Sequence, residues 1–245
     1  MGRNSVMKVD LFIPCFIDQL FPQTGFNMIK ILEKHDVEVH YNPNQTCCGK
    51  ISFNQGYWDD AKDIGEKFIR DFSNNRYVVG GSASCVGFIK NYYWKLFYNT
   101  GLHLEFKQLH KNIFEFSDFM VNVLRITDVG AVFPYKVTYH DSCSALREYG
   151  IKDEPRYLLN QVKGLQLIEM KGNEECCGFG GAFSTKYEAV SIAMTKDKVE
   201  AALETGAEYI VSVDAGCLIQ LDGYIRKNNL PLKCIHLIDV LASGW

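Results

Sequence analysis

The sequence predicts an α/β protein made of two similar Rossmann-like domains with parallel sheets, related by internal duplication about a pseudo-twofold axis. Strand-like apolar runs alternate with amphipathic helical patterns along the chain, which is typical of a parallel sheet covered by helices. Eight of the nine cysteines form two copies of one pattern, C-x31-C-C-G-x35-C and C-x32-C-C-G-x38-C. This period is far too long for a solenoid, so it indicates two similar domains.

The first half is expected to contain three strands and two long helices. In order, the predicted elements are a strand over 9–14, a helix over 25–35, a strand over 37–41, a helix over 57–72 and a strand start at 77–79. Apolar side chains recur at three- and four-residue intervals from Trp58 to Phe72, the spacing of one helix face. Farther on, Tyr93, Trp94, Phe97 and Tyr98 recur at the spacing of a helical core, with a partner-docking surface as the alternative.

The second half repeats this order. Its predicted elements are a strand over 136–140, a helix over 155–161, a strand over 165–170, a helix over 187–204, a strand over 209–213, a helix over 218–227 and a last strand near 232–237. The boundary is expected between Asp128 and Pro134, which gives a first cysteine-rich domain over 7–130 and a second over 131–245. Met1–Val6 is expected to be an unstructured leader.

Composition excludes several classes of function. The chain has 245 residues, is 47% hydrophobic and has a formal net charge of -3, which argues against disorder and against binding to nucleic acid. No apolar run approaches the roughly 18 residues of a spanning helix, and no signal peptide is recognisable, so we expect a cytoplasmic protein without membrane insertion. Thiols stay reduced in the cytoplasm, so the cysteines are expected to be metal ligands or redox groups.

The repeated cysteines are predicted to gather at one edge of each sheet. One cysteine of each set follows the first strand of its half and one follows a later strand, while the Cys-Cys pairs lie in loops after the second strand. Ligands of open α/β sheets bind at this edge. The predicted ligands are Cys15, Cys47, Cys48 and Cys85 in the first set, and Cys143, Cys176, Cys177 and Cys217 in the second. By count, four thiolates suit a [4Fe–4S] cluster or a tetrahedral zinc ion.

Other residues are predicted to support these sites. Gly49 and Gly178 follow the cysteine pairs, where a residue without Cβ lets the backbone approach an inorganic core. His140 and Asp141 precede Cys143 closely enough to hydrogen-bond around cluster sulfurs, with a core histidine and a capping aspartate as the alternative. Arg147 is a candidate for neutralising cluster charge or holding a carboxylate substrate, or else lies on a solvated helix face.

Cys234 has no counterpart in the first half and is expected to be a core residue.

These motifs resemble the cysteine-rich domain family named for its CCG sequence, which includes the CCG-containing subunit of heterodisulfide reductase, the iron–sulfur subunit of glycolate oxidase and, most closely, the lactate utilisation A proteins. The resemblance covers 8–244. Its closest stretches are Cys47-Cys48-Gly49, Tyr139-His140-Asp141-Ser142-Cys143, Glu175-Cys176-Cys177-Gly178-Phe179-Gly180-Gly181 and Gly216-Cys217-Leu218. The resemblance implies a cytoplasmic iron–sulfur protein that acts in the oxidation of L-lactate to pyruvate beside partner proteins, including a ferredoxin-type iron–sulfur protein.

The sequence departs from the heterodisulfide reductase pattern at the end of each cysteine set. That pattern ends in C-x-x-C, whereas Cys85 is followed by Val86-Gly87-Phe88 and Cys217 by Leu218-Ile219-Gln220. The fifth ligand of a non-cubane cluster is therefore absent twice. Within the lactate utilisation group, Ser144 stands where a histidine is common, and Lys50-Ile51 replaces a common Gln-Pro.

We therefore expect an iron–sulfur electron-transfer subunit of an L-lactate (2-hydroxy acid) oxidising complex, with one [4Fe–4S] cluster in each repeat. As such it would be part of an oxidoreductase and not a complete enzyme by itself. Two alternatives are a zinc-binding structural module of a redox complex and a heterodisulfide-reductase-like thiol redox enzyme, against which the missing fifth cysteines argue.

Overall fold

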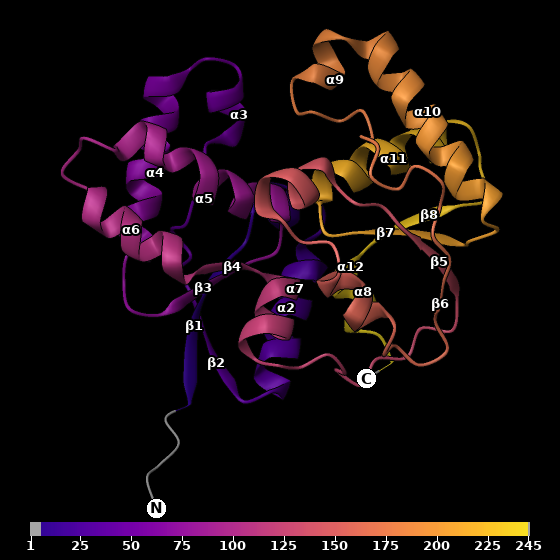
Figure 1. Ribbon diagram of the computed structural model, residues 1–245, viewed down its shortest axis with the longest axis horizontal. Helices are drawn as coiled ribbons and strands as arrows, with labels where there is room; N and C mark the ends of the chain where they lie inside the picture. Colours follow the sequence, from indigo (N-terminus) through magenta and orange to yellow (C-terminus); the bar gives the residue numbers. More distant parts are fainter. Residues whose placement is uncertain (1–5, 245) are drawn as a thin grey trace, which may run out of the picture.

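Two four-stranded parallel sheets, one from each half of the chain, form the framework of the molecule (Figure 1). The computed structural model describes residues 6–244, so the expected leader lies almost wholly outside the described residues. The first sheet has the order β2-β1-β3-β4 and the second β6-β5-β7-β8, so each half follows the same path. Val9 pairs with Tyr77 in the first sheet and Val137 with Tyr209 in the second, an equivalent register. The duplicated α/β fold predicted from the sequence is confirmed.

The strands are short, and all except β4, for which no strand was predicted, lie close to their predicted positions. Those of the first half are β1 (Met7–Phe12), β2 (Val37–Tyr41), β3 (Tyr77–Gly80) and β4 (Ile113–Glu115), and those of the second are β5 (Lys136–Tyr139), β6 (Gln166–Leu167), β7 (Tyr209–Ser212) and β8 (Lys233–His236). The strand expected over 165–170 is wrong in length. After Leu167 the edge strand leaves the sheet, because the chain turns toward the second cysteine pair.

The helices flank the sheets on both faces. Those of the first half are α1 (Cys15–Leu20), α2 (Pro22–Lys34), α3 (Lys50–Asn54), α4 (Trp58–Phe72), α5 (Ala83–Phe97), α6 (His103–Asn112) and α7 (Phe116–Asp118), followed by the π-helix η1 (Phe119–Val123). Those of the second half are the π-helix η2 (Ala145–Tyr149), α8 (Glu154–Leu159), α9 (Phe183–Lys186), α10 (Glu188–Glu204), α11 (Ala215–Lys227) and α12 (Leu237–Leu241). The prediction that α11 begins at Leu218 is wrong, because Asp214 precedes its first turn and Cys217 lies within that turn.

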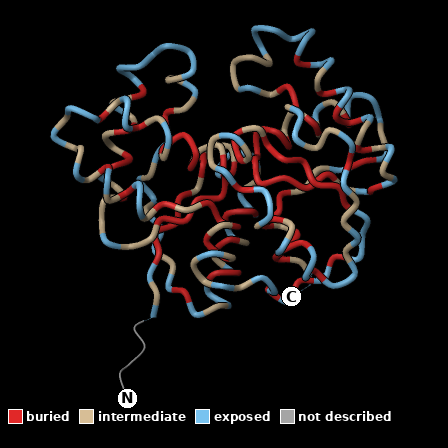
Figure 2. Tube along the Cα trace, in the orientation of Figure 1, coloured by how far each residue is buried: buried red, intermediate tan, exposed pale blue. Residues whose placement is uncertain are grey.

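One apolar core joins the two halves. Helices α2 and α12 pack together, as do α7 and α8, in the lower middle of Figure 1. Leu11 and Met28 of the first half belong to the same cluster of buried side chains as Val137 and Leu237 of the second. Figure 2 shows this buried region as a red band across the middle of the molecule. The cysteine-bearing edges of both sheets are therefore held against each other.

The outer helices cover the opposite faces of the sheets. In Figure 1, α4, α5 and α6 stand over the first sheet, and α10 and α11 over the second. Tyr93 and Phe97 of α5 are buried, as predicted, but Trp94 is 50% exposed and Tyr98 is 62% exposed. The predicted core role of Trp94 and Tyr98 is wrong. Each directly follows a buried residue, and successive side chains along a helix point in directions about 100° apart. No helix in the part of the chain described here is long and apolar enough to cross a membrane.

Candidate metal centre

All eight repeated cysteines line one cavity of about 240 Å³ between the two halves. Cys15 begins α1 directly after β1, and Cys85 lies in the first turn of α5 after β3. Cys143 follows β5 and Cys217 lies in the first turn of α11 after β7, so the second half repeats this placement. The cysteine pairs reach the same cavity from the loops before α3 and α9.

The cysteines of the first half form one contiguous set. The Sγ atoms of Cys15 and Cys47 lie 3.8 Å apart. The Cys48 thiol interacts with those of both Cys47 and Cys85 and is buried. The backbone N–H of Gly49 donates to the Cys47 sulfur over 3.4 Å. The four thiols of this half are therefore linked by contacts between neighbours along one wall of the cavity.

The second half has the same connections. The Cys176 thiol interacts with those of Cys143 and Cys177, and the Cys177 thiol interacts with that of Cys217. The Gly178 N–H donates to the Cys176 sulfur over 3.4 Å, as Gly49 does in the first half. The repeat seen in the sequence is thus a repeat of atomic contacts as well.

Crowding of the thiols opposes their ionisation. The hydrogen bond with Cys47 raises the pKa of Cys15, and the one with Cys176 raises that of Cys143. The pKa of Cys47 is lowered because its sulfur accepts hydrogen bonds from Cys15 and from backbone N–H groups. Several thiolates at such short range repel one another unless a cation lies between them. The donor set therefore fits a metal ion or an iron–sulfur cluster in each half.

The glycine after each cysteine pair is required by its conformation and its surroundings. Gly49 has φ of +82° and Gly178 has φ of +88°, values that other residues rarely adopt. A Cβ atom on Gly178 would lie 2.5 Å from the carbonyl oxygen of Ser191, and one on Gly49 would lie 3.2 Å from that of Ala61. Both glycines let the cysteine loop pack directly on the following long helix.

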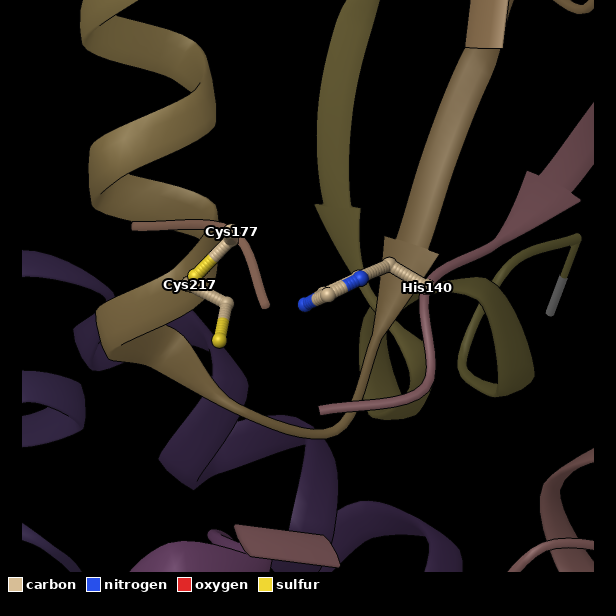
Figure 3. A group of neighbouring side chains, drawn as sticks. All are labelled: His140, Cys177 and Cys217. Carbon is tan, nitrogen blue, oxygen red and sulfur yellow. The ribbon is translucent and has the colours of Figure 1, made fainter. Parts of the chain in front are cut away.

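His140 lies beside the second set. One ring nitrogen and the sulfurs of Cys177 and Cys217 lie within 4.8 Å of one another, and the ring extends from the end of β5 toward the two thiols (Figure 3). The side chain is fully buried, and its ring interacts with the backbone of Asn173, although in the described residues neither ring nitrogen meets the geometry of a full hydrogen bond. Burial, together with Lys198, lowers the pKa of His140 to about 3. The neutral ring can donate one hydrogen bond into the site.

Asp141 and Arg147 have other surroundings. Asp141 is 2% exposed and forms a bidentate ion pair with Arg156, with N–O distances of 2.9 and 2.6 Å. Arg147 is exposed, and its guanidinium donates to the Glu174 carbonyl over 3.4 Å. Neither side chain lines the cysteine cavity in the described part of the molecule.

Three charged residues in the cavity wall, Lys50, Glu148 and Asp214, were not among the predicted site residues. Lys50 reaches across the boundary, donating to Ser144 Oγ over 2.9 Å and to Glu148 over 2.8 Å. Asp214 is 2% exposed and accepts hydrogen bonds from Ser82 and Ser142. Lys50 and Asp214 adjoin the predicted ligand motifs, and this adjacency was the signal in the sequence that could have identified them as site residues.

Cys234 lies in β8, outside the residues that line the cysteine cavity, and it is partly buried against the apolar cluster below α11.

The fold and the site together define a class of protein: a duplicated α/β fold with a cavity between its halves that is lined by two sets of four cysteines. The family model described as "Cysteine-rich domain" (CCG) matches residues 9–90 and again 137–222. The chain belongs to this cysteine-rich CCG family.

Its relatives include proteins named for lactate utilisation. The chain is 40% identical to lactate utilization protein A of Oceanobacillus iheyensis over 237 residues, which is 97% of each chain. It is 38% identical to lactate utilization protein A of Geobacillus thermodenitrificans, covering 96% of this chain and 98% of the relative. It is 36% identical to lactate utilization protein A 2 of Bacillus cereus, covering 97% of this chain and 99% of the relative.

A crystal structure of a hypothetical protein from Helicobacter pylori shares the fold, with a TM-score of 0.63 at 12% identity. That similarity covers 99% of this chain and 50% of the other.

Proposed function

We propose that the chain is the iron–sulfur electron-transfer subunit of a cytoplasmic complex that oxidises L-lactate or another 2-hydroxy acid, with one [4Fe–4S] cluster in each repeat. The observation that carries this proposal is the equivalence of two four-thiol sets around one cavity. The names of the relatives support lactate as the substrate of the complex. A bound cluster supplies one-electron chemistry at a potential set by its surroundings.

The residues of the chain hold and shield such a group. Cys48, Cys177 and Cys217 are at most 7% exposed, and the other five cysteines of the two sets are half-buried, so each set has at least one thiol kept from solvent. Backbone N–H groups of Gly49 and Gly178 donate to cysteine sulfurs, which stabilises their negative charge. Gly49 and Gly178 also place both members of each cysteine pair at one site.

Partner proteins complete the proposed reaction. No dinucleotide-binding glycine fingerprint follows a strand in this sequence, so the group that takes electrons from the substrate is assigned to another chain. We assign this chain to a lactate utilisation complex that includes a ferredoxin-type iron–sulfur protein.

One distance favours a second candidate, a structural zinc module. Four sulfurs around zinc at about 2.3 Å are separated by roughly 3.8 Å in a tetrahedron. The Sγ atoms of Cys15 and Cys47 are 3.8 Å apart. In this alternative the chain organises a redox complex by its shape and transfers no electrons.

Metal and sulfide analysis separates the two candidates. The full chain is prepared without oxygen, and iron, acid-labile sulfide and zinc are measured together with the visible spectrum before any reconstitution. About eight iron and eight sulfide per chain, with an absorption that bleaches on reduction, are expected for two four-iron clusters. Stoichiometric zinc without sulfide would reject the electron-transfer function and support the structural module.

A further inference from the structure

The two cysteine sets have equivalent positions and different surroundings. Helix α4 covers the first set and α10 the second, and their buried residues correspond one to one at an offset of 130. The buried face of α4 consists of Ala61, Gly65, Phe68, Ile69 and Phe72. That of α10 consists of Ser191, Thr195, Lys198, Val199 and Ala202. Three positions that are apolar or glycine in the first repeat carry a hydroxyl or an ammonium group in the second.

The largest difference is an aromatic pair replaced by a polar pair. In the first half the rings of Phe12, at the end of β1, and Phe68 meet edge to face, with centroids 4.8 Å apart. Their equivalents are His140, at the end of β5, and Lys198, whose charge acts on the His140 ring. His140 is fully buried and Lys198 is 2% exposed. A polar pair thus occupies the place of an apolar one beside the second set.

A third position strengthens the contrast. Gln220 of α11 corresponds to Phe88 of α5, at the offset of 132 that relates Cys85 to Cys217. Phe88 is fully buried in the aromatic cluster of the first half. The Gln220 amide donates to the hydroxyls of Ser191 and Thr195 over 3.0 and 2.9 Å. The Thr195 hydroxyl in turn donates to the carbonyl of Cys177 over 2.8 Å.

Lys198 brings a buried cation to the second set. Its ammonium group donates to the Gly172 carbonyl. Burial lowers the pKa of Lys198, whereas Glu175 and the thiols of Cys177 and Cys176 act to raise it. Thiolates that hold a cluster would strengthen that opposing effect and keep the amine protonated.

Two further charges act on the cavity. Asp214 opposes Lys198, because its carboxylate acts on Cys217 and Cys143. Two serine hydroxyls and Lys50 stabilise that carboxylate, which limits its effect on the cavity. Lys50 also acts on Cys85 of the first set and on Cys143 of the second, so its charge does not distinguish the two sets.

We infer that the second set, Cys143, Cys176, Cys177 and Cys217, holds its cluster at a higher reduction potential than the first, through the polar shell formed by the buried Lys198 and His140 and the half-buried Gln220. The inference rests on the proposed function. Reduction adds one negative charge, which a nearby ammonium and hydrogen-bond donors stabilise and an aromatic shell does not. An electron shared between the two sites therefore resides mainly at the second.

A redox titration of the full chain tests the inference. Protein with verified iron and sulfide content is titrated without oxygen and followed by electron paramagnetic resonance. Two separate one-electron steps are expected. The Lys198→Met variant should lower the equilibrium constant of the higher-potential reduction step about tenfold, which lowers its reduction potential by about 59 mV for one electron. The lower-potential step should keep its reduction potential. His140→Phe, which installs the residue of the first repeat, should act in the same direction.

Lys196→Met is the matched control. It removes the same charge from the same helix, but the Lys196 side chain is 54% exposed, so both steps should keep their potentials. A single shared potential, or a Lys198→Met variant that shifts both steps or neither, would overturn the inference. If Lys198→Met does not fold, Gln220→Leu gives the same comparison. Absence of iron and sulfide from the parent chain would refute the proposed function itself, a result distinct from equal potentials.

Discussion

Ser82 and Asp214 occupy the same position in the two repeats, and they hydrogen-bond to each other across the boundary between the halves. The Ser82 hydroxyl donates to Asp214 Oδ1 over 2.7 Å, and both residues are buried. Each precedes the helix that carries the last cysteine of its set, Cys85 or Cys217. Two equivalent residues that touch must lie at the pseudo-twofold axis. Two aspartates here would repel each other, whereas serine opposite aspartate forms a bond.

Loss of this bond should weaken the association of the two halves. Ser82→Ala removes one of the two serine hydroxyls that donate to Asp214, and a hydrogen bond to a buried charged group contributes about 1.5–3 kcal/mol. We expect the free energy of unfolding in urea to fall by that amount. Thr185→Ala, which removes an exposed hydroxyl that donates to the Ala182 carbonyl, should change the free energy of unfolding by no more than about 0.5 kcal/mol, as is usual for a surface substitution. Equal losses of unfolding free energy in the two variants would show that the contact between Ser82 and Asp214 contributes no more to stability than a surface hydrogen bond.

The glycine after the second cysteine pair should tolerate alanine least. Gly178→Ala combines φ of +88° with a Cβ atom 2.5 Å from a carbonyl oxygen, whereas Gly56→Ala has φ of +87° and nothing within 4 Å. Gly56→Ala therefore isolates the conformational cost of about 1–2 kcal/mol. Urea unfolding should show a larger loss for Gly178→Ala, with Gly49→Ala between the two. The expectation fails if Gly178→Ala and Gly56→Ala unfold at the same midpoint.

The fold was predictable because two independent patterns agree. The apolar run that becomes β5 and the long amphipathic pattern that becomes α4 are local signals, and the cysteine repeat showed that the second half copies the first. Edge strand β6 was predicted too long, because its two paired residues carry little sequence signal. Trp94 was misplaced because the run of aromatic residues in α5 obscures which face is buried.

The thiol ligands are chemically distinctive, and the groups around them are not. Lys198 lies in a helix that is polar on several faces, so its burial leaves no mark in the local pattern. Asp214 resembles an ordinary residue at a helix start, and its partner Ser82 comes from the other half of the chain. An alignment of the two repeats distinguishes both residues, because Lys198 corresponds to the apolar Phe68 and Asp214 to the uncharged Ser82.

Removal of one cysteine should empty one site and spare the other. Cys85→Ser removes a thiol from the first set and Cys217→Ser one from the second, so each variant should keep about half of the iron and sulfide of the parent chain. Cys234→Ser is the matched control, because Cys234 lies outside the cavity, and it should keep all of the metal. Full loss in Cys85→Ser would mean that the two sites fill together, and metal loss in Cys234→Ser would contradict the ligand assignment.

Glu115 should make stability fall with rising pH. Its side chain is fully buried at the start of α7, and burial raises the pKa of Glu115 to about 8. The unfolded chain releases this proton near pH 4.5, and the folded chain keeps it until about pH 8. The unfolded state thus binds fewer protons in that interval, so this residue lowers the free energy of unfolding as pH rises from 4.5 to 8.

Glu115→Gln removes the proton equilibrium and keeps an oxygen that can accept the Ser117 N–H. The stability of the variant relative to the parent should therefore increase with pH across this interval, by up to about 1.4 kcal/mol per pH unit. Urea unfolding at pH 5, 6.5 and 8 measures that difference. Glu204→Gln, at an exposed position near the end of α10, should reproduce the parent profile. A constant difference between Glu115→Gln and the parent at all three pH values would mean that Glu115 is ionised in the folded protein throughout.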